Sequence, residues 1–523
     1  MPSIAESYDE LPYPDLVYPE TNPNRLAAIA ALLGLPAKNP ARSRILELGC
    51  GSGSNLISMA VEWPEANLVG VDFSGRQIDA GKEILAASGA HNVALHHADL
   101  TSIGPDWGQF DYIIAHGLYS WVPAEVQAKI LAICRAHLAP AGIAYISYNC
   151  YPGWHMRSTV RDMLTFHTAQ ISGAQAKVQQ SRVLLDFMAS NASPGSDYAK
   201  MLKGEAELLA TYQDGALFHE YLEHHNAPLY FHQFAERAAA AGLQYMGDAN
   251  PQTISDGGLA PDARETLYRI GNRNLLQTEQ YLDFLRNRSF RQSLLVHQET
   301  PLQRVFNLQE LRRLYIAAPI ASETEGFDPN TPDAVVFSLP NNQRFSVSNP
   351  LIKAALAALG KQWPESVSFS DLAGTVSAAL NRTGPEGLSA EETTTLEHFL
   401  LSGFLHGNIE LTVEPWQCKR ASNGNPEVTA LNRHQAAHDL PIVNQRHQII
   451  QDTPGLRLVI QHLDGRHSME ELAEMLFQRA RGGEFQLSRG GQVVTEADEL
   501  RRLIGEDVPV YIRQISGLSL LID

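Results

Sequence analysis

The alternation of short apolar runs with helical patterns between Arg44 and Asn149 constrains this fold more than any other feature. In order, the runs are RILELGC, NLISMAVEW, NLVGVDF, RQIDAGKEILAASG, VALHHADL, FDYIIAHG, AEVQAKILAICRAHL and GIAYISYN. Short runs that are apolar throughout are typical of buried strands, whereas apolar residues at helical spacing indicate amphipathic helices. We therefore expect five parallel strands with intervening helices, which is a Rossmann-like α/β sheet.

A glycine-rich turn follows the first expected strand. Glu47 precedes Gly49, Gly51 and Gly53, and Asn55 follows as the chain turns into a helix. Glycines let the backbone approach a ligand that a Cβ would exclude. Dinucleotide sites have the spacing G-x-G-x-x-G, whereas this turn has G-x-G-x-G with an acid two residues before the first glycine. The spacing favours S-adenosylmethionine (SAM) over NAD, with these five residues binding the cofactor.

Acidic residues end the next two expected strands. Asp72 lies 19 residues after Gly53, where a carboxylate can accept both ribose hydroxyls. Asp99 ends the third strand and can accept from the adenine amino group, and Phe73 and Leu100 are expected to flank the adenine ring. If each acid is considered alone, a role as the N-cap of a helix explains it at least as well as cofactor binding does. Residues suited to binding a nucleoside follow three successive strands in order, so a chance occurrence of all three is improbable.

The loops after the fourth and fifth expected strands are rich in aromatic residues. Ligands of doubly wound sheets bind beyond the carboxyl ends of the strands, so these loops are expected to wall a methyl-acceptor site, with His116 and Gly117 reaching the cofactor. Aromatic walls align a nucleophile and exclude water, although core packing explains each ring about equally well. The catalytic candidates are Tyr119, Trp121, Tyr151 and His155, with Trp154 beside them. If the acceptor is a lysine amine, burial among these rings lowers its pKa, and a tyrosine or His155 can pass the proton on.

Charge and cysteine content restrict the class of protein. Lys+Arg 40 against Asp+Glu 58 gives a net charge of -18, which repels phosphate backbones and argues against nucleic acid as acceptor. The four cysteines form no CxxC pair, which argues against a disulfide framework or a metal site and for a reducing compartment. Without an export signal or an apolar run of about 20 residues, we expect a cytoplasmic protein without membrane insertion.

At 523 residues the chain is expected to contain two or three packed units. The SAM-binding domain is expected over residues 1–154, with an N-terminal arm over residues 1–40. Residues 155–228 show long helical patterns and no strand, so we interpret them as a helical insertion in the catalytic domain. Residues 229–300 resume with a helix that ends at Gly242 and two strands, which we interpret as the last helix and closing hairpin of the sheet.

Residues 301–523 contain two similar helix-turn-helix-like passages, LIKAALAALGKQWPESVSFSDLAGTVSAAL and LRLVIQHLDGRHSMEELAEMLFQRA. Ser468 and Glu471 have capping-box spacing at a helix start. A strand pair is expected after each passage, around GNIELTV and VPVYIRQISGLSLLI, so we predict an α+β region of two winged-helix-like units. Residues 371–404 carry several glutamates and almost no Lys or Arg, which favours contact with protein over DNA.

Two other segments each have a functional and a simpler interpretation. His219 begins a cluster with His224 and His225, but the motif H-E-x-x-H requires histidine where the chain has Glu223. We therefore expect a solvated helix face and no metal site. The stretches YDELPY and YPETNP near the N-terminus are too rich in proline for helix, and they form either a lid over the cofactor or an arm packed on the surface.

Together these segments resemble a bacterial family of class I methyltransferases with a methyltransferase regulatory domain, including protein lysine methyltransferases that act on outer-membrane proteins. The resemblance covers YDELPYPDLVYPETNP, ILELGCGSGSNL, VGVDFSGRQIDAG, FDYIIAHGLYSWVP, AYISYNCYPGWHMRSTVRDML and, for the regulatory part, FHEYLEHHNAPLYFHQFAERAAAAGLQY. It is specific over roughly the first 300 residues. It implies a SAM site at Gly49, Gly51, Gly53, Asp72 and Asp99, a homodimer contact through the helical segment, and C-terminal domains that help to hold a protein substrate.

We therefore expect an enzyme that transfers a methyl group from SAM to a protein side-chain amine of lysine, with S-adenosylhomocysteine as product. More than 200 residues beyond the catalytic domain suggest a large partner. One alternative is a small-molecule N- or O-methyltransferase with appended regulatory or dimerisation domains, which would act on free metabolites without its C-terminal half. The other is a non-catalytic SAM sensor, which would bind SAM and transfer no methyl group.

Overall fold

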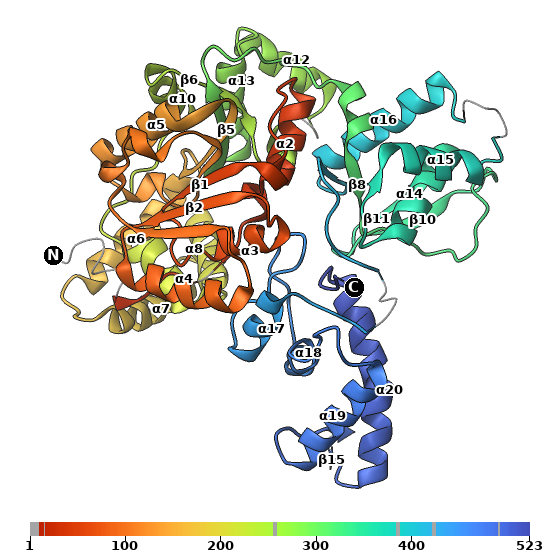
Figure 1. The fold of residues 1–523 in the computed structure, drawn as a ribbon. Coiled ribbons are helices and arrows are strands. Elements are labelled where there is room, and N and C mark those ends of the chain that lie inside the picture. Colours follow the sequence, from red (N-terminus) through yellow and green to blue (C-terminus); the bar gives the residue numbers. More distant parts are fainter. Residues whose placement is uncertain are drawn as a thin grey trace.

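One mixed sheet organises the N-terminal 300 residues in the computed structural model of the chain (Figure 1). The structure describes residues 10–14, 16–254, 259–382, 387–420, 425–489 and 492–522. In these ranges the sheet has seven strands: β1 (Arg44–Leu48), β2 (Asn67–Asp72), β3 (Val93–His97), β4 (Phe110–Ala115), β5 (Leu138–Asn149), β6 (Leu243–Asp248) and β7 (Phe290–His297). Their order is β3-β2-β1-β4-β5-β7-β6, and β1 to β5 are parallel, as predicted.

Helices cover both faces of this sheet. Successive residues of β1 enter different cores, because Ile45 packs on one face and Leu46 on the other. One core includes side chains of α2 (Pro23–Leu32), α3 (Ser54–Glu62) and α4 (Gly75–Ser88), and the other includes those of α5 (Ala124–His137) and α10 (Phe231–Ala240). Burial on both faces explains why the strands are apolar throughout rather than alternating.

The last two strands close the sheet in an unexpected way. β7 inserts between β5 and β6 and is antiparallel to both. The predicted pairing of the two strands is confirmed, but the hairpin connection is wrong. Between β6 and β7 the chain forms α11 (Pro251–Ile254), α12 (Pro261–Ile270) and α13 (Leu275–Arg286).

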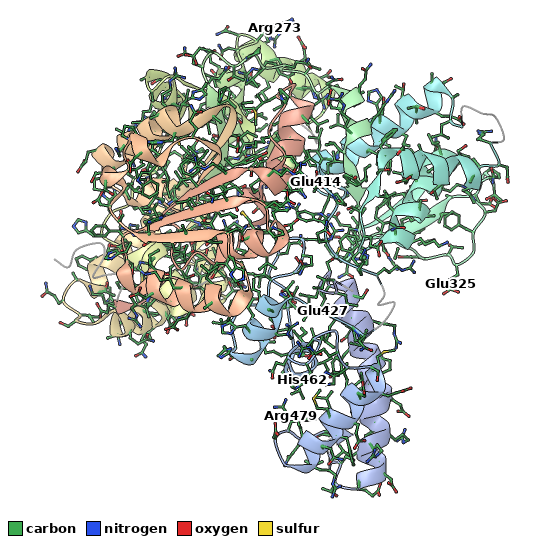
Figure 2. The ribbon with its side chains drawn as sticks, in the orientation of Figure 1. Arg273, Glu325, Glu414, Glu427, His462 and Arg479 are labelled. Atoms are coloured by element: carbon green, nitrogen blue, oxygen red, sulfur yellow. The ribbon has the colours of Figure 1, made fainter. Side chains whose placement is uncertain are left out.

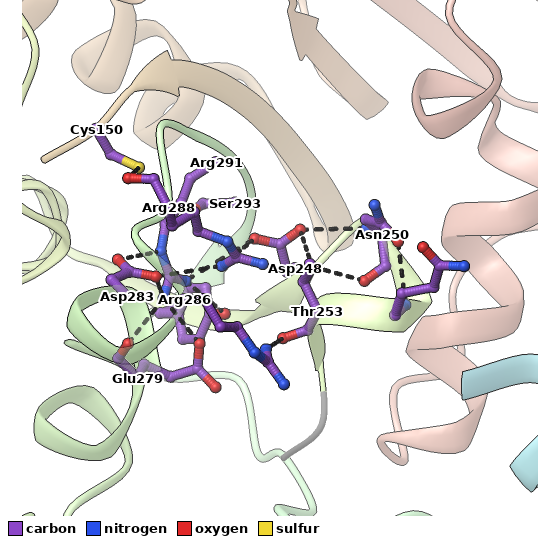
Figure 3. A network of polar contacts seen from close by, with 12 residues as sticks. Cys150, Asp248, Asn250, Thr253, Glu279, Asp283, Arg286, Arg288, Arg291 and Ser293 are labelled. Atoms are coloured by element: carbon purple, nitrogen blue, oxygen red, sulfur yellow. Dashed lines mark hydrogen bonds and ion pairs between the residues drawn. The ribbon is translucent and has the colours of Figure 1, made fainter. Parts of the chain in front are cut away.

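A buried guanidinium joins β7 to α13. Arg291 is 1% exposed, and its Nε and Nη2 donate to the two carboxylate oxygens of Asp283 at 2.8 Å each. Its Nη2 also donates to Glu279 Oε2 at 2.9 Å, and its Nη1 donates to the Tyr245 hydroxyl of β6 at 3.3 Å. Arg288 extends the network to Asp248 (Figure 3). The closing strands and α13 are therefore held together by ionic contacts that are shielded from water.

The segment between β5 and α10 is helical, as predicted. It contains α6 (Trp154–Thr168), α7 (Ala174–Asn191), α8 (Asp197–Ala210), α9 (Asp214–Leu217) and a π-helix, η6 (Phe218–Leu222). A separate core, including Val160 and Leu202, holds these helices together. Phe166 and Phe187 are exposed on them. The homodimer contact through this segment stays a prediction.

The chain after β7 first forms a middle unit, which shares its core with one face of the catalytic sheet. Its elements are β8 (Tyr315–Ala317), β9 (Ala321–Ser322), β10 (Val335–Ser338), β11 (Arg344–Val347), α14 (Pro350–Gln362), β12 (Val367–Ser368), α15 (Phe369–Ala379), α16 (Ala390–Leu405) and β13 (Glu410–Thr412). The expected strand at GNIELTV is β13, and its partner is β8 rather than a following strand. β8 also pairs with β12, which precedes α15.

The C-terminal unit extends away from the sheet in Figure 1. It contains α17 (Ala430–Ala437), α18 (Pro454–Ile460), α19 (Met469–Arg481), β14 (Ser488–Arg489), β15 (Gln492–Val493) and α20 (Ala497–Gly517). The capping box of Ser468 and Glu471 is confirmed by both of its hydrogen bonds. The strand pair expected at VPVYIRQISGLSLLI is wrong, because residues of α20 at helical spacing, including Leu500, Ile504 and Val508, pack against α19.

The middle unit contacts the catalytic domain at α2. The side chain of Asn24 accepts from the backbone of Val413 and Glu414 at 3.0 and 2.9 Å, and Arg25 pairs with Glu410 at 3.3 Å. Figure 2 labels Glu414 at this junction. On the other side, Leu431 of α17 packs against side chains of α3 and α4. None of the described helices combines the length and apolar character needed to cross a bilayer.

We predict that Arg291→Met destabilises the catalytic domain strongly, because buried Glu279 loses its cation and buried Asp283 keeps only Arg288, at 3.5 Å. Breaking such a pair costs about 3–5 kcal/mol, which corresponds to a fall of about 6–20 °C in the unfolding midpoint by calorimetry. The matched control is Arg42→Met, since Arg42 and its partner Glu65 are 77% and 70% exposed. That variant is expected within about 2 °C of the wild type. Equal effects of both substitutions would contradict this prediction.

Candidate active site

The loop between β1 and α3 is shaped by backbone that favours glycine. Gly49, Gly51 and Gly53 have φ angles of 71°, 55° and 77°, in the left-handed region. A fourth glycine approaches the loop from α4. A Cβ built on Gly81 lies 1.9 Å from the backbone oxygen of Ser52, so α4 packs directly on the loop. Sequence reasoning missed Gly81, although a glycine inside a helical pattern is itself a signal of close packing.

Asp72 holds this loop from the end of β2. Its Oδ2 accepts from the Gly51 backbone N–H at 2.8 Å, and its Oδ1 accepts from that of Ser74 at 2.8 Å. Burial raises the pKa of Asp72, although these backbone donors oppose the rise. The N-cap of α4 is Ser74, which accepts from the Gln77 backbone N–H, so the capping explanation does not apply to Asp72.

Asp99 differs from Asp72, because it does serve as a cap. Its Oδ1 accepts from the Thr101 backbone N–H at 2.7 Å at the start of a short 3-10 helix, Leu100–Ser102. This bond holds the pKa of Asp99 below its usual value. Capping does not exclude a ligand role, since Asp99 also lines the cavity described below. Phe73 lines the same cavity and is 51% exposed.

Glu47 lies at the base of the site, and burial raises its pKa to about 8. Its Oε1 accepts from Asn55 Nδ2 at 2.8 Å, whereas Oε2 is buried without a hydrogen-bond partner among the described residues. Asn55 Oδ1 accepts from the Tyr18 backbone N–H at 3.1 Å, and its Nδ2 donates to the Thr21 hydroxyl at 3.1 Å. The N-terminal arm therefore contacts the first turn of α3 through Asn55.

The N-terminal arm also covers His116. The rings of Tyr18 and His116 stack with centroids 3.7 Å apart, and burial lowers the pKa of His116 to about 3. The neighbouring Gly117 donates its backbone N–H to the Ser147 hydroxyl at 2.8 Å.

Four residues of the N-terminal arm line the cavity: Tyr13, Pro14, Leu16 and Tyr18. Their position favours the interpretation of the arm as a lid over the site rather than as an arm packed on the surface. Residues 1–9 lie outside the described residues. The expectation that the proline-rich stretch YPETNP excludes helix is wrong, because Pro19–Thr21 forms a 3-10 turn and Pro23 starts α2.

A cavity of about 620 Å³ lies at the carboxyl ends of the parallel strands. Most of the predicted site residues line it: Glu47, Gly49, Gly51, Asn55, Asp72, Phe73, Asp99, Leu100, His116, Gly117 and Trp121. Gly53 does not line it and instead supplies the N-cap of α3. The structure thus brings together residues from all of the first four strand ends.

The other three catalytic candidates do not line this cavity. Tyr119 is fully buried in the core, where its ring contacts Phe234 edge-on at 5.4 Å, so the expectation that it walls the acceptor site is wrong. Tyr151 and His155 stack at 4.1 Å outside the cavity, and His155 contacts the Tyr230 hydroxyl at 3.3 Å. A role for these two residues in catalysis stays a prediction.

The helical insertion contributes lining residues that were not predicted. They are Arg157 of α6, Tyr212 after α8, and His219 and Glu220 of η6. The solvated face expected around His219 is wrong: His219 is 2% exposed, and its Nε2 donates to the Leu11 carbonyl at 2.7 Å. No local motif identifies these residues, because they meet the sheet only through the packing of the insertion. Among the described residues no cluster of His, Cys, Asp and Glu has the arrangement of a metal site.

Three family profiles match the chain. They are described as "Methyltransferase domain" over residues 45–142, "Predicted methyltransferase regulatory domain" over residues 213–297, and "PKMT, C-terminal winged helix domain" over residues 424–520. An uncharacterized protein of Rickettsia prowazekii is 34% identical over 98% of this chain and 93% of its own length.

Among solved structures, PKMT2 from Rickettsia typhi in complex with AdoHcy is 30% identical, with a TM-score of 0.89, and the match covers 98% of this chain and 100% of PKMT2. The chain belongs to the PKMT family. It is therefore a class I methyltransferase that uses SAM, with a regulatory domain and a C-terminal winged-helix domain, which confirms the predicted fold class, enzyme class and cofactor.

The cavity of this PKMT family member fits SAM in shape and charge. The left-handed loop leaves space that Cβ atoms would fill, and Asp72 and Asp99 line the cavity beside the exposed ring of Phe73. SAM carries a sulfonium and an ammonium. The unpartnered Oε2 of Glu47 provides an acceptor for a cationic donor.

We predict that Gly81→Ala weakens SAM binding, because the added Cβ displaces Ser52 and with it the cofactor loop. Overpacking of this kind costs about 1–3 kcal/mol, and we expect the dissociation constant for SAM to rise at least about tenfold by calorimetry. Gly204→Ala is the matched control, since Gly204 is exposed inside α8 with no atom within 4 Å of its Cβ position. It should stabilise the chain slightly and leave SAM affinity unchanged. Unchanged affinity in Gly81→Ala would refute the prediction.

We also predict that pairing of Glu47 with SAM is pH-dependent. A carboxyl with a pKa of about 8 must lose its proton to pair with a cation, so this pairing strengthens as pH rises toward 8 and is constant above. The ratio of dissociation constants, Glu47→Gln over wild type, is therefore expected to rise from pH 6 to 8. Titration of the cofactor cancels in this ratio. A ratio that does not change with pH would show that Glu47 does not pair with the cofactor as an anion.

Proposed function

We propose that this methyltransferase acts on the side-chain amine of lysine in a protein substrate. The observation that carries the proposal is the charge of the cavity. Its described lining has four carboxyl groups, Glu47, Asp72, Asp99 and Glu220, against one guanidinium, that of Arg157, and Glu47, whose pKa burial raises to about 8, becomes fully anionic near neutral pH only on pairing with a cation. Arg157 also faces Glu205, at 3.9 Å. A cavity of this kind favours a cationic acceptor beside the cationic cofactor, and disfavours phosphates and carboxylates.

The part of the cavity formed by the insertion suits an alkyl ammonium group. Tyr212 supplies aromatic surface there and Glu220 supplies a carboxyl, and Trp121 contributes a second aromatic ring to the cavity from the loop after β4. Aromatic faces attract cations, and their apolar bodies accommodate the methylene chain of a lysine. Trp121 also contacts Trp154 edge-on at 6.4 Å, which fixes its ring.

Transfer requires a neutral amine, and we propose that Glu220, which lines the cavity, takes its proton. Only about one lysine in 10³ is neutral near pH 7.4, which corresponds to about 4 kcal/mol. Burial raises the pKa of Glu220 above its usual value, although Arg157 and His219 oppose the rise. The amine proton passes to the Glu220 carboxylate, and the nitrogen then has a free lone pair. SAM, when bound, would supply an electrophilic methyl carbon for attack by this lone pair, with the bond to sulfur breaking so that S-adenosylhomocysteine leaves.

The size of the chain supports a protein rather than a metabolite as substrate. The middle and C-terminal units add surface on one side of the catalytic domain, whereas a small acceptor needs only the cavity. One relative with a solved structure is named PKMT2, and the profile over residues 424–520 is described as a PKMT domain, which agrees with the resemblance to protein lysine methyltransferases. We propose that these units hold the substrate, and that the chain acts in the cytoplasm as a homodimer.

The test is transfer of radiolabelled methyl from SAM into fractionated lysate, followed by hydrolysis of the labelled protein and identification of methyl-lysine. Glu220→Gln is expected to lower the transfer at least about tenfold with little change in SAM affinity, because it removes a proton acceptor. The control is Glu207→Gln, whose side chain is 70% exposed on α8. Label in small molecules alone would favour the metabolite enzyme. SAM binding without transfer to any fraction would favour the sensor.

A further inference from the structure

A histidine of the C-terminal unit reaches the base of the cofactor site. His447 lies between α17 and α18, is 1% exposed, and has a φ of 59°. Its Nε2 contacts Asn55 Oδ1 at 2.7 Å, and its Nδ1 contacts the Ser58 hydroxyl at 3.1 Å. Both partners belong to α3, and Asn55 is 392 residues away in sequence. The C-terminal unit is therefore in direct contact with a residue that lines the SAM site.

The direction of each hydrogen bond is determined by its neighbours. The backbone N–H of Tyr18 can only donate, so the atom of Asn55 that faces it is Oδ1. His447 Nε2 must then carry a proton and donate it to the same oxygen, which leaves Nδ1 to accept from Ser58. Burial lowers the pKa of His447 to about 3, in agreement with a neutral ring. The Asn55 amide nitrogen is directed to Glu47 and Thr21.

The turn that carries His447 is held rigidly. Asn444 Oδ1 accepts from the backbone of Arg446 and Gln448 at 3.0 Å each. The Arg446 guanidinium is fully buried over the ring of Trp363 at 4.1 Å and pairs with Glu410 of the middle unit. These contacts hold the left-handed backbone at His447, so the imidazole is presented to Asn55 without the freedom of an ordinary loop side chain.

We propose that His447 is a positioning residue of the SAM site, through which the C-terminal unit orients Asn55 and so fixes Glu47, which lines the cavity. His447 itself does not line the cavity and acts through Asn55. The inference depends on SAM binding and not on the identity of the methyl acceptor. It predicts that docking of the C-terminal unit and binding of SAM strengthen each other, because both depend on the same carboxamide.

Two substitutions separate the contacts of His447. In His447→Gln the amide nitrogen can replace Nε2 and donate to Asn55, whereas the shorter side chain of His447→Asn can reach only Ser58. Asn tolerates the positive φ of this position better than Gln does, so backbone strain would weaken His447→Gln rather than His447→Asn, which is opposite to the expected result. We expect the dissociation constant for SAM, measured by calorimetry on the full chain, to rise at least about tenfold in His447→Asn and to stay within about threefold in His447→Gln.

Leu431→Ala tests whether looser docking alone explains such a loss. Leu431 packs on α3 and α4 without contacting Asn55. This variant is expected to lower the unfolding midpoint and to leave SAM affinity within about threefold of wild type. A double-mutant cycle of His447→Asn with Glu47→Gln should be non-additive. Equal SAM affinity in His447→Asn and His447→Gln, a loss in Leu431→Ala as large as in His447→Asn, or additivity in the cycle would each overturn the proposal.

Discussion

The active site depends on one buried carboxamide, that of Asn55. Its oxygen accepts from the Tyr18 backbone and from His447, and its nitrogen donates to Glu47 and Thr21. These four bonds use the full capacity of a primary amide, two donated and two accepted, so rotation of the side chain would break all of them. The N-terminal arm, β1, α3 and the C-terminal unit meet at this group. The site is therefore a property of the whole chain rather than of the Rossmann-like sheet alone.

Charged groups stabilise the same junction at a larger scale. Glu410 of β13 lies between Arg25 of α2 and Arg446 of the C-terminal unit. Burial alone would raise the pKa of Glu410, but the two guanidinium groups bring it below its usual value. Removing either neighbouring unit leaves part of this charge uncompensated in a partly dry environment, which is unfavourable. The catalytic, middle and C-terminal units are thus connected by electrostatics as well as by apolar packing.

Local sequence signals made the sheet and the cofactor loop predictable. Contacts between segments that are distant in sequence could not be predicted, because they leave no local pattern. Buried strands and left-handed glycines leave patterns within a few residues, as at Gly49 and Gly51. Asp72 and Asp99 look alike in sequence, yet only Asp99 caps a helix, because Ser74 already caps α4. Glu220 reaches the cavity only through packing of the insertion. In α20, burial of one helical face outweighs the strand preference of its β-branched residues.

The position of β7 also affects how the protein is made. β5 ends at Asn149, but its second neighbour begins only at Phe290. At translation rates of about 5–20 residues per second, the ribosome needs about 7–28 s to synthesise the residues between them. During that interval a central strand exposes unpaired backbone groups, which promotes association between nascent chains. The helical insertion is synthesised in the same interval. A chain truncated before residue 290 would retain the cofactor loop but would lack β7, so that β5 and β6 would each be left without their shared neighbour.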